Sequence, residues 1–214
     1  MIKGIIFDLD GVIVSTDRFH YQAWKAIADQ EGIYFDEEIN NRLRGVSRME
    51  SLDIVLEKAD RRYGPEEKAA LADKKNRIYR SLLGRLSEND VAKEDREALL
   101  ELRNRGYRLA IGSSSKNTPL ILERIGLVSY FDAVADGNQI TKSKPDPEVF
   151  LLAASLIGLR PGEAAVVEDA KAGIDAAKAA SFMAIGIGEA GKYAKIDARV
   201  GRLTDLLSLF PRQN

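Results

Sequence analysis

The chain has 214 residues, of which 45% are hydrophobic and 30% charged, a composition that is ordinary for a globular protein. Lysine and arginine number 32 and aspartate and glutamate 33, so the net charge of −1 provides no general attraction for nucleic acid or an anionic membrane. The absence of cysteine excludes disulfides, zinc–thiolate sites and thiol catalysis. The first apolar run is interrupted at Asp8, too early for a signal peptide, and no run is long enough to span a membrane. We therefore expect a cytoplasmic protein, a monomer with no nucleic-acid or membrane partner.

The first strand is expected at residues 5–7, which are apolar, β-prone and few enough to lie buried in a parallel sheet. Asp8 and Asp10 follow at a spacing that places both side chains on the same side of an extended backbone, and Gly11 then allows a sharp turn. Two buried carboxylates side by side require a neutralising cation, and oxygen ligands favour Mg²⁺. Residues 8–11 are also compatible with an ordinary polar turn.

Helical patterns fill the next part of the chain, with no strand between residues 15 and 87; they cover residues 16–31, 36–44, 48–62 and 65–85. Strands and helices then alternate. Strands are expected at residues 107–112, 133–135, 164–167 and 182–187, the last good strand, and helices at residues 94–105, 119–125, 147–157 and 170–180. This alternation predicts an α/β fold with a doubly wound, Rossmann-like parallel sheet and right-handed crossovers. We expect a catalytic core of residues 1–14 and 88–214, with residues 15–87 inserted as a helical cap above the strand ends.

Polar residues follow the carboxyl ends of successive predicted strands: Asp8 and Asp10, then Ser113, then Lys144, then Glu168 and Asp169. Open α/β sheets bind ligands at that edge, so these side chains are expected in one crevice. Taken singly, they also suit a turn serine, a solvated loop lysine and acids that cap a helix. Together, the carboxylates can bind Mg²⁺ and a phosphate, while the hydroxyl and the ammonium hold the remaining phosphoryl oxygens. The expected nucleophile is a carboxylate.

These motifs resemble, in order, the four motifs of the haloacid dehalogenase superfamily of phosphotransferases: Asp8-Leu9-Asp10-Gly11, Ser113, Lys144-Pro145 and Glu168-Asp169. The resemblance implies that Asp8 attacks phosphorus and forms an aspartyl-phosphate. Asp10 would act as general acid and base, and its backbone carbonyl would help to bind Mg²⁺. Ser113 and Lys144 would position the phosphoryl group, and Glu168 and Asp169 would complete the metal site. A second acid favours phosphoryl transfer over dehalogenation, because a sugar alkoxide needs a proton to leave and a halide does not.

Further residues resemble the β-phosphoglucomutase family within this superfamily: Thr16, His20, Trp24, Gly45, Val46, Ser47, Arg48, Lys75, Asn76, Ser113, Ser114, Ser115, Lys116 and Asn117. That family interconverts β-glucose 1-phosphate and glucose 6-phosphate through a bound 1,6-bisphosphate. The resemblance therefore implies a sugar-phosphate substrate and a second anion pocket away from the metal.

Arg48 suits this distal phosphate because its planar fork of donors matches phosphate oxygens, and Lys116 and Asn117 are expected to help hold it. Residues 45–47 would contact the sugar through their backbone, with Ser51 within reach of it. By the same resemblance, His20 and Lys75 would couple cap closure to the positioning of Asp10. Thr16 would lie at the hinge. Without that resemblance, His20 would be read as a packed residue of the cap.

Two other functions remain open at this stage. A sugar-phosphate phosphatase of the same superfamily would use the same core motifs. A receiver-like signalling module, phosphorylated at Asp136 after the third strand, would share the doubly wound sheet, but it leaves the cap unexplained. The chain also departs from the family pattern in places, for example at Ser181, where a glycine is common.

Overall fold

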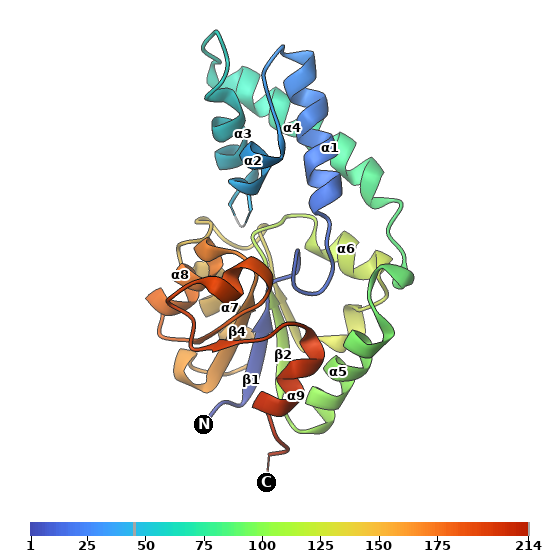
Figure 1. Ribbon diagram of the computed structural model, residues 1–214, viewed down its shortest axis with the longest axis vertical. Coiled ribbons are helices and arrows are strands. Elements are labelled where there is room, and N and C mark those ends of the chain that lie inside the picture. Colours follow the sequence, from blue (N-terminus) through green and yellow to red (C-terminus); the bar gives the residue numbers. More distant parts are fainter. Residues whose placement is uncertain (45, 214) are drawn as a thin grey trace.

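The structure is a computed structural model that describes residues 1–44 and 46–213. In this part of the chain, six parallel strands form one sheet in the order β3-β2-β1-β4-β5-β6. They are β1 (Gly4–Phe7), β2 (Arg108–Gly112), β3 (Ala133–Ala135), β4 (Ala164–Glu168), β5 (Met183–Gly186) and β6 (Ala198–Arg199). The sequence order runs outward from β1 in both directions, which confirms the predicted doubly wound sheet (Figure 1).

Helices cover both faces of the sheet (Figure 1). One face carries α5 (Lys93–Asn104), α6 (Thr118–Arg124) and α9 (Leu206–Leu209), and the other carries α7 (Glu148–Leu156) and α8 (Lys171–Ala179). Successive side chains of a strand point to opposite faces. Ile5 and Phe7 therefore pack in the first core, while Ile6 between them packs against Phe150 in the second.

A third hydrophobic core lies in the helical cap, which comprises α1 (Asp17–Gln30), α2 (Glu37–Asn41), α3 (Arg48–Leu56) and α4 (Pro65–Leu83). Trp24 and Ile27 of α1 pack there with Leu52 of α3 and Leu71 of α4. The strands point toward the cap, which lies over their carboxyl ends (Figure 1). The cap boundaries at residues 15 and 87 stay a prediction.

Local sequence explains where the cap helices begin. The side chain of Asp36 accepts a hydrogen bond from the Ile39 N–H and starts α2. Ser47 and Glu50 form a reciprocal capping box that starts α3. Pro65 occupies the first turn of α4, where its missing N–H costs no helical hydrogen bond. Short 3₁₀ helices occur elsewhere, at Glu88–Asp90, Val128–Tyr130, Pro161–Glu163, Gly188–Lys192 and Leu203–Asp205.

Three predicted elements differ from the structure. The helix expected over residues 36–44 ends at Asn41 and is followed by a turn. The helix expected over residues 48–62 ends at Leu56, because the following residues 57–62 are almost all polar and offer no further face to bury. The strand at residues 182–187 is not the last one, since β6 pairs beside it. Two residues are too few to show an alternating pattern, so β6 left no sequence signal. Among the described residues, no helix is long and apolar enough to cross a membrane.

Candidate active site

The strand register brings the predicted motifs to one edge of the sheet. Phe7 pairs with Ile111 on β2 and with Val167 on β4. The residues that follow are therefore at the same level, and Asp8 lies beside Glu168. Residues far apart in the sequence therefore share one crevice between core and cap, as expected for the strand ends of a parallel sheet.

Three carboxylates form a cluster that fits a metal ion. One oxygen each from Asp8, Glu168 and Asp169 lies within 4.8 Å of the others. Lys144 crosses to them from the loop after β3, and its Nζ lies 2.6 Å from Asp8 Oδ1 and 3.5 Å from Glu168 Oε1. The second oxygen of Glu168, Oε2, is buried without a hydrogen-bond partner. A buried carboxylate oxygen of this kind needs a cation, and an all-oxygen donor set suits Mg²⁺.

The electrostatics of the cluster support this interpretation. Burial raises the pKa of Glu168 well above its usual range, and the charges of Asp8 and Asp169 act in the same direction. Burial, with the charge of Asp8, raises the pKa of Asp169 to about 7. Burial alone would lower the pKa of Lys144, but the charges of Asp8 and Glu168 raise it overall. The lysine therefore stays charged. Three carboxylates face this single ammonium group, so a divalent cation would balance the remaining negative charge.

Gly11 is required by the close approach of the loop after β1 to the acid cluster. Its φ is +82°, and a Cβ at this position would lie 2.1 Å from Asp169 Oδ2. A side chain at residue 11 would therefore collide with the carboxylate and strain the backbone. The glycine of the first motif allows the loop and Asp169 to share this space.

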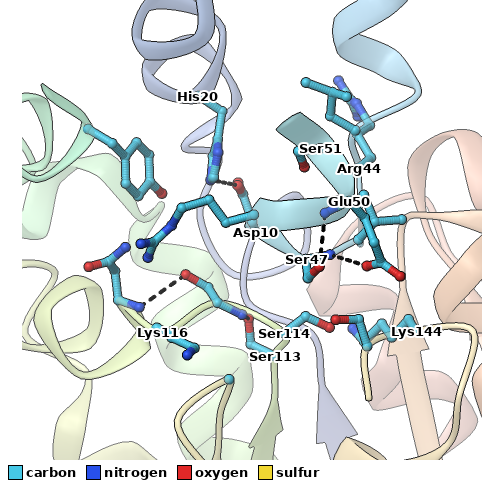
Figure 2. A pocket seen from close by; sticks show the side chains of 18 of the residues that line it. Asp10, His20, Arg44, Ser47, Glu50, Ser51, Ser113, Ser114, Lys116 and Lys144 are labelled. Carbon is cyan, nitrogen blue, oxygen red and sulfur yellow. Dashed lines mark hydrogen bonds and ion pairs between the residues drawn. The ribbon is translucent and has the colours of Figure 1, made fainter. Parts of the chain in front are cut away.

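The side chain of Asp10 turns away from the three-carboxylate cluster toward the cap. It accepts two hydrogen bonds from Thr16, one from the backbone N–H and one from the hydroxyl, each 2.6 Å long. His20 Nε2 lies 3.6 Å from the same carboxylate (Figure 2). Desolvation under the cap raises the pKa of Asp10 to about 6, although the Thr16 hydrogen bonds act to lower it. This carboxyl group can therefore take up and release a proton near neutral pH.

A polar chain in the cap supports His20. Lys75 Nζ lies 2.9 Å from His20 Nδ1 and 4.8 Å from the centroid of the Trp24 ring. Burial lowers the pKa of Lys75 to about 7 and also lowers the pKa of His20. With Nδ1 accepting from lysine, the neutral imidazole carries its proton on Nε2, the atom that faces Asp10. Trp24, expected at the substrate, is a member of the cap core and also borders the cavity.

Tyr79 is a residue of the site that sequence reasoning missed. Its hydroxyl lies 2.7 Å from the Thr16 hydroxyl, so it extends the hydrogen-bonded chain that begins at Asp10. Its ring packs against His20 with centroids 4.1 Å apart. Tyr79 lies one turn after Lys75 on α4 and therefore shares its face, which is the signal that could have identified it.

The predicted substrate-binding residues border one cavity of about 780 Å³ between cap and core. Its lining includes Trp24, Val46, Ser47, Arg48, Ser51, Lys75, Ser114, Ser115, Lys116 and Asn117. Figure 2 shows His20, Arg44 and Ser51 on the cap side and Ser113, Ser114, Lys116 and Lys144 on the core side. Gly45 was also predicted to contact the sugar, and it lies outside the described residues.

The residues after β2 form a turn that leads into α6. The Ser113 hydroxyl accepts from the Ser115 N–H, and the Ser115 hydroxyl accepts from the Asn117 N–H. Ser114 also borders the cavity, and its hydroxyl is buried without a hydrogen-bond partner among the described residues. In the cap, the Ser47 N–H already donates to the Glu50 carboxylate. In this conformation the capping box therefore occupies a backbone group that was expected to meet the sugar.

Arg44 is a second residue that the sequence did not single out. Its Nη1 lies 3.5 Å from Asp169 Oδ2, so a cap side chain contacts the predicted metal site. Asp17 pairs with the same guanidinium and also accepts a 3.2 Å hydrogen bond from the Asn40 side chain. Asp17 at the start of α1, itself held by Asn40 of α2, therefore fixes this cation over the acid cluster.

Asp136, the alternative phosphorylation site, lies outside this arrangement. It follows β3, an edge strand of the sheet, and its carboxylate accepts hydrogen bonds from Asn138. Asp8, by contrast, follows a strand in the interior of the sheet. The geometry thus favours Asp8 over Asp136 as the reactive carboxylate.

A family model described as haloacid dehalogenase-like hydrolase matches residues 2–181, and the chain belongs to this family. It is 40% identical over 207 residues to the β-phosphoglucomutase of Bacillus subtilis, with 96% of this chain and 92% of that protein covered. A phosphorylated carbohydrates phosphatase of Thermotoga maritima is 32% identical over 182 residues, covering 85% of this chain and 82% of that protein. The crystal structure of β-phosphoglucomutase from Clostridium difficile matches with a TM-score of 0.90 and 36% identity, covering 96% and 93% of the two chains. These findings confirm the resemblance drawn from the motifs.

Proposed function

We propose that the chain is an Mg²⁺-dependent phosphomutase that interconverts β-glucose 1-phosphate and glucose 6-phosphate through a 1,6-bisphosphate. The observation that carries the proposal is a single cavity with two cationic ends. Lys144 lies at the acid cluster in the core, whereas Arg48 of the cap and Lys116 border the same cavity. A bisphosphate needs two such ends, while hydrolysis of one phosphate needs only the first. The identity to the Bacillus subtilis mutase supports the same function.

The first half-reaction transfers a phosphoryl group to Asp8. Its carboxylate attacks phosphorus while the bond from phosphorus to the sugar oxygen breaks, and Asp10 delivers its proton to that oxygen. Lys144 orients the Asp8 carboxylate and, with Ser113, holds charge on the phosphoryl oxygens. Mg²⁺ bound by Asp8, Glu168 and Asp169 would neutralise phosphoryl charge and favour attack by an anionic carboxylate.

The second half-reaction returns the group to the other end of the sugar. Asp10 now takes the proton of the second hydroxyl as that oxygen attacks the aspartyl-phosphate, which restores Asp8. This second step forms the 1,6-bisphosphate, which must turn over before its other phosphoryl group can be transferred to Asp8, and Arg48 would hold whichever phosphate is not reacting. The cap has to exclude water during this exchange, because an aspartyl-phosphate is prone to hydrolysis.

A product assay tests the proposal. The protein is incubated with β-glucose 1-phosphate, Mg²⁺ and a trace of glucose 1,6-bisphosphate, and glucose 6-phosphate and free phosphate are measured together. We expect glucose 6-phosphate to form much faster than free phosphate. When the phosphoryl groups of the substrate are labelled, we also expect acid-quenched samples to carry that label on Asp8. Asp8→Asn is the control, since an amide cannot act as the nucleophile.

The alternative is a sugar-phosphate phosphatase. The phosphatase of Thermotoga maritima favours it, because a relative at 32% identity bears that name. In the same assay a phosphatase releases free phosphate as fast as it consumes β-glucose 1-phosphate, with no dependence on the bisphosphate. That result would replace the mutase proposal.

A further inference from the structure

The Asn117 side chain connects the core to cap helix α4. It is only 4% exposed and lies at the start of α6. Its Oδ1 accepts a 3.2 Å hydrogen bond from Arg80 Nη1, and its Nδ2 donates a 3.0 Å hydrogen bond to Asn76 Oδ1. Both partners belong to α4, so the amide bridges two positions of one cap helix.

These contacts determine which way the amide faces. A carboxamide has an oxygen and a nitrogen of almost equal size, so its neighbours decide which end lies where. Asn76 is itself an amide and can offer either a donor or an acceptor. Arg80 can only donate, so it fixes Oδ1 of Asn117 toward itself. The Nδ2 group, which has a second N–H beyond the one given to Asn76, is thereby kept as a donor.

Asn76 and Asn117 border the cavity, as does Arg48. Burial lowers the pKa of the Arg48 guanidinium; the charge of Asp73 opposes this shift and that of Arg80 adds to it. Two guanidiniums are therefore close enough to repel each other at this end of the cavity. A bound anion would relieve that repulsion.

We propose that Arg80 is a positioning residue for the distal phosphate of a sugar bisphosphate. The inference rests on the mutase function proposed above. Arg80 does not contact the reacting atoms. It holds the Asn117 amide so that an N–H, and not the carbonyl oxygen, is presented to phosphate. Were the amide reversed, its oxygen would face the anion and repel it.

The test compares Arg80→Gln with Arg77→Gln, a matched loss of an exposed arginine on the same helix. We expect Arg80→Gln to raise the KM for glucose 1,6-bisphosphate about tenfold, the effect of one misplaced hydrogen bond to a charged group. Turnover of phenyl phosphate, which has no distal phosphate, should change less than about twofold, within ordinary context effects. Arg77→Gln should leave both unchanged, and Arg80→Lys should restore part of the affinity.

A double-mutant cycle separates the positioning role from a general role in cap docking. In an Asn117→Ala background, Arg80→Gln should have no further effect on the bisphosphate, because the group it positions is gone. An unchanged KM in Arg80→Gln, or equal losses on both substrates, would overturn the inference. The shift in Tm on adding glucose 1,6-bisphosphate gives a reading independent of turnover. If the wild-type protein lacks mutase activity but shows a shift that Arg80→Gln abolishes, the proposed function fails and the inference stands.

Discussion

Asp10 and Thr16 are joined by two 2.6 Å hydrogen bonds, so the carboxyl group assigned to proton transfer is held by the residue that precedes the first cap helix. Thr16 is completely buried, and its hydroxyl also contacts Tyr79 on α4. The Asp10 carboxyl group is therefore held in place by Thr16, whose hydroxyl is in turn held by a cap helix.

The first prediction concerns this pair. Thr16→Val removes a hydrogen bond that lowers the pKa of Asp10, so this pKa should rise above its value of about 6. We expect the kcat–pH profile to show an ionisation near pH 6 in the wild type, and this ionisation should move to higher pH in Thr16→Val. Thr16→Ser keeps the hydroxyl and should retain the wild-type profile. An unmoved ionisation in Thr16→Val would show that it does not belong to Asp10.

The second prediction uses the buried Lys75. Its pKa is lowered from 10.5 to about 7 on folding, so between these pH values the unfolded chain binds a proton that the folded chain does not. The Lys75 contribution to the free energy of unfolding should therefore rise as pH increases from about 7 to 10.5. Lys75→Met keeps the length of the side chain and should lose this part of the pH dependence. The measurement is urea unfolding across that range, and identical pH profiles for the two proteins would contradict it.

The third prediction concerns Arg44 and the metal site. Because its guanidinium pairs with Asp169, a metal ion has to compete for that carboxylate. Arg44→Ala should lower the Kd for Mg²⁺ by about two- to fivefold, the effect of a partly exposed ion pair. Arg42→Ala is the matched control, since Arg42 lies in the same segment but pairs with Glu57. Calorimetric titration measures both, and weaker Mg²⁺ binding in Arg44→Ala would mean that the arginine supports the site.

The fourth prediction concerns the end of α8. Ser181 has a φ of +64°, a left-handed conformation that is unfavourable for any residue with a Cβ. Ser181→Gly should stabilise the protein by about 0.5–1 kcal/mol, because relief of this strain exceeds the entropic cost of glycine. Ser181→Ala keeps the Cβ and should gain nothing. The measurement is chemical unfolding of both variants. A Ser181→Gly protein that is no more stable than the Ser181→Ala protein would contradict the explanation.

The sequence was sufficient for the parts of the site that follow strands. Asp8, Ser113 and Glu168 are placed by the pairing of short apolar strands, and a parallel sheet has one edge at which such residues can meet. Lys144 was found the same way, although it reaches the cluster from a loop. For these residues, local pattern and global fold give the same answer.

The residues that the sequence did not reveal are those whose role depends on how the cap sits on the core. Tyr79 shares a helix face with Lys75, and Arg80 is an ordinary exposed position of the same helix, but neither spacing tells which residues outside α4 they contact. Arg44 lies in a short turn after α2 with no periodic pattern. Their contacts are tertiary, so only the structure can supply them.

Helix α4 contacts the site at two separate places. Tyr79 contacts Thr16 beside Asp10, while Asn76 and Arg80 both hydrogen-bond the side chain of Asn117, which borders the same cavity. Because both sets of contacts belong to one helix, a shift of α4 at one place would also change its contacts at the other. For the mutase proposed above, this would make binding depend on the length of the ligand: a sugar with a phosphate at each end would engage both places, whereas a shorter ligand would engage only one.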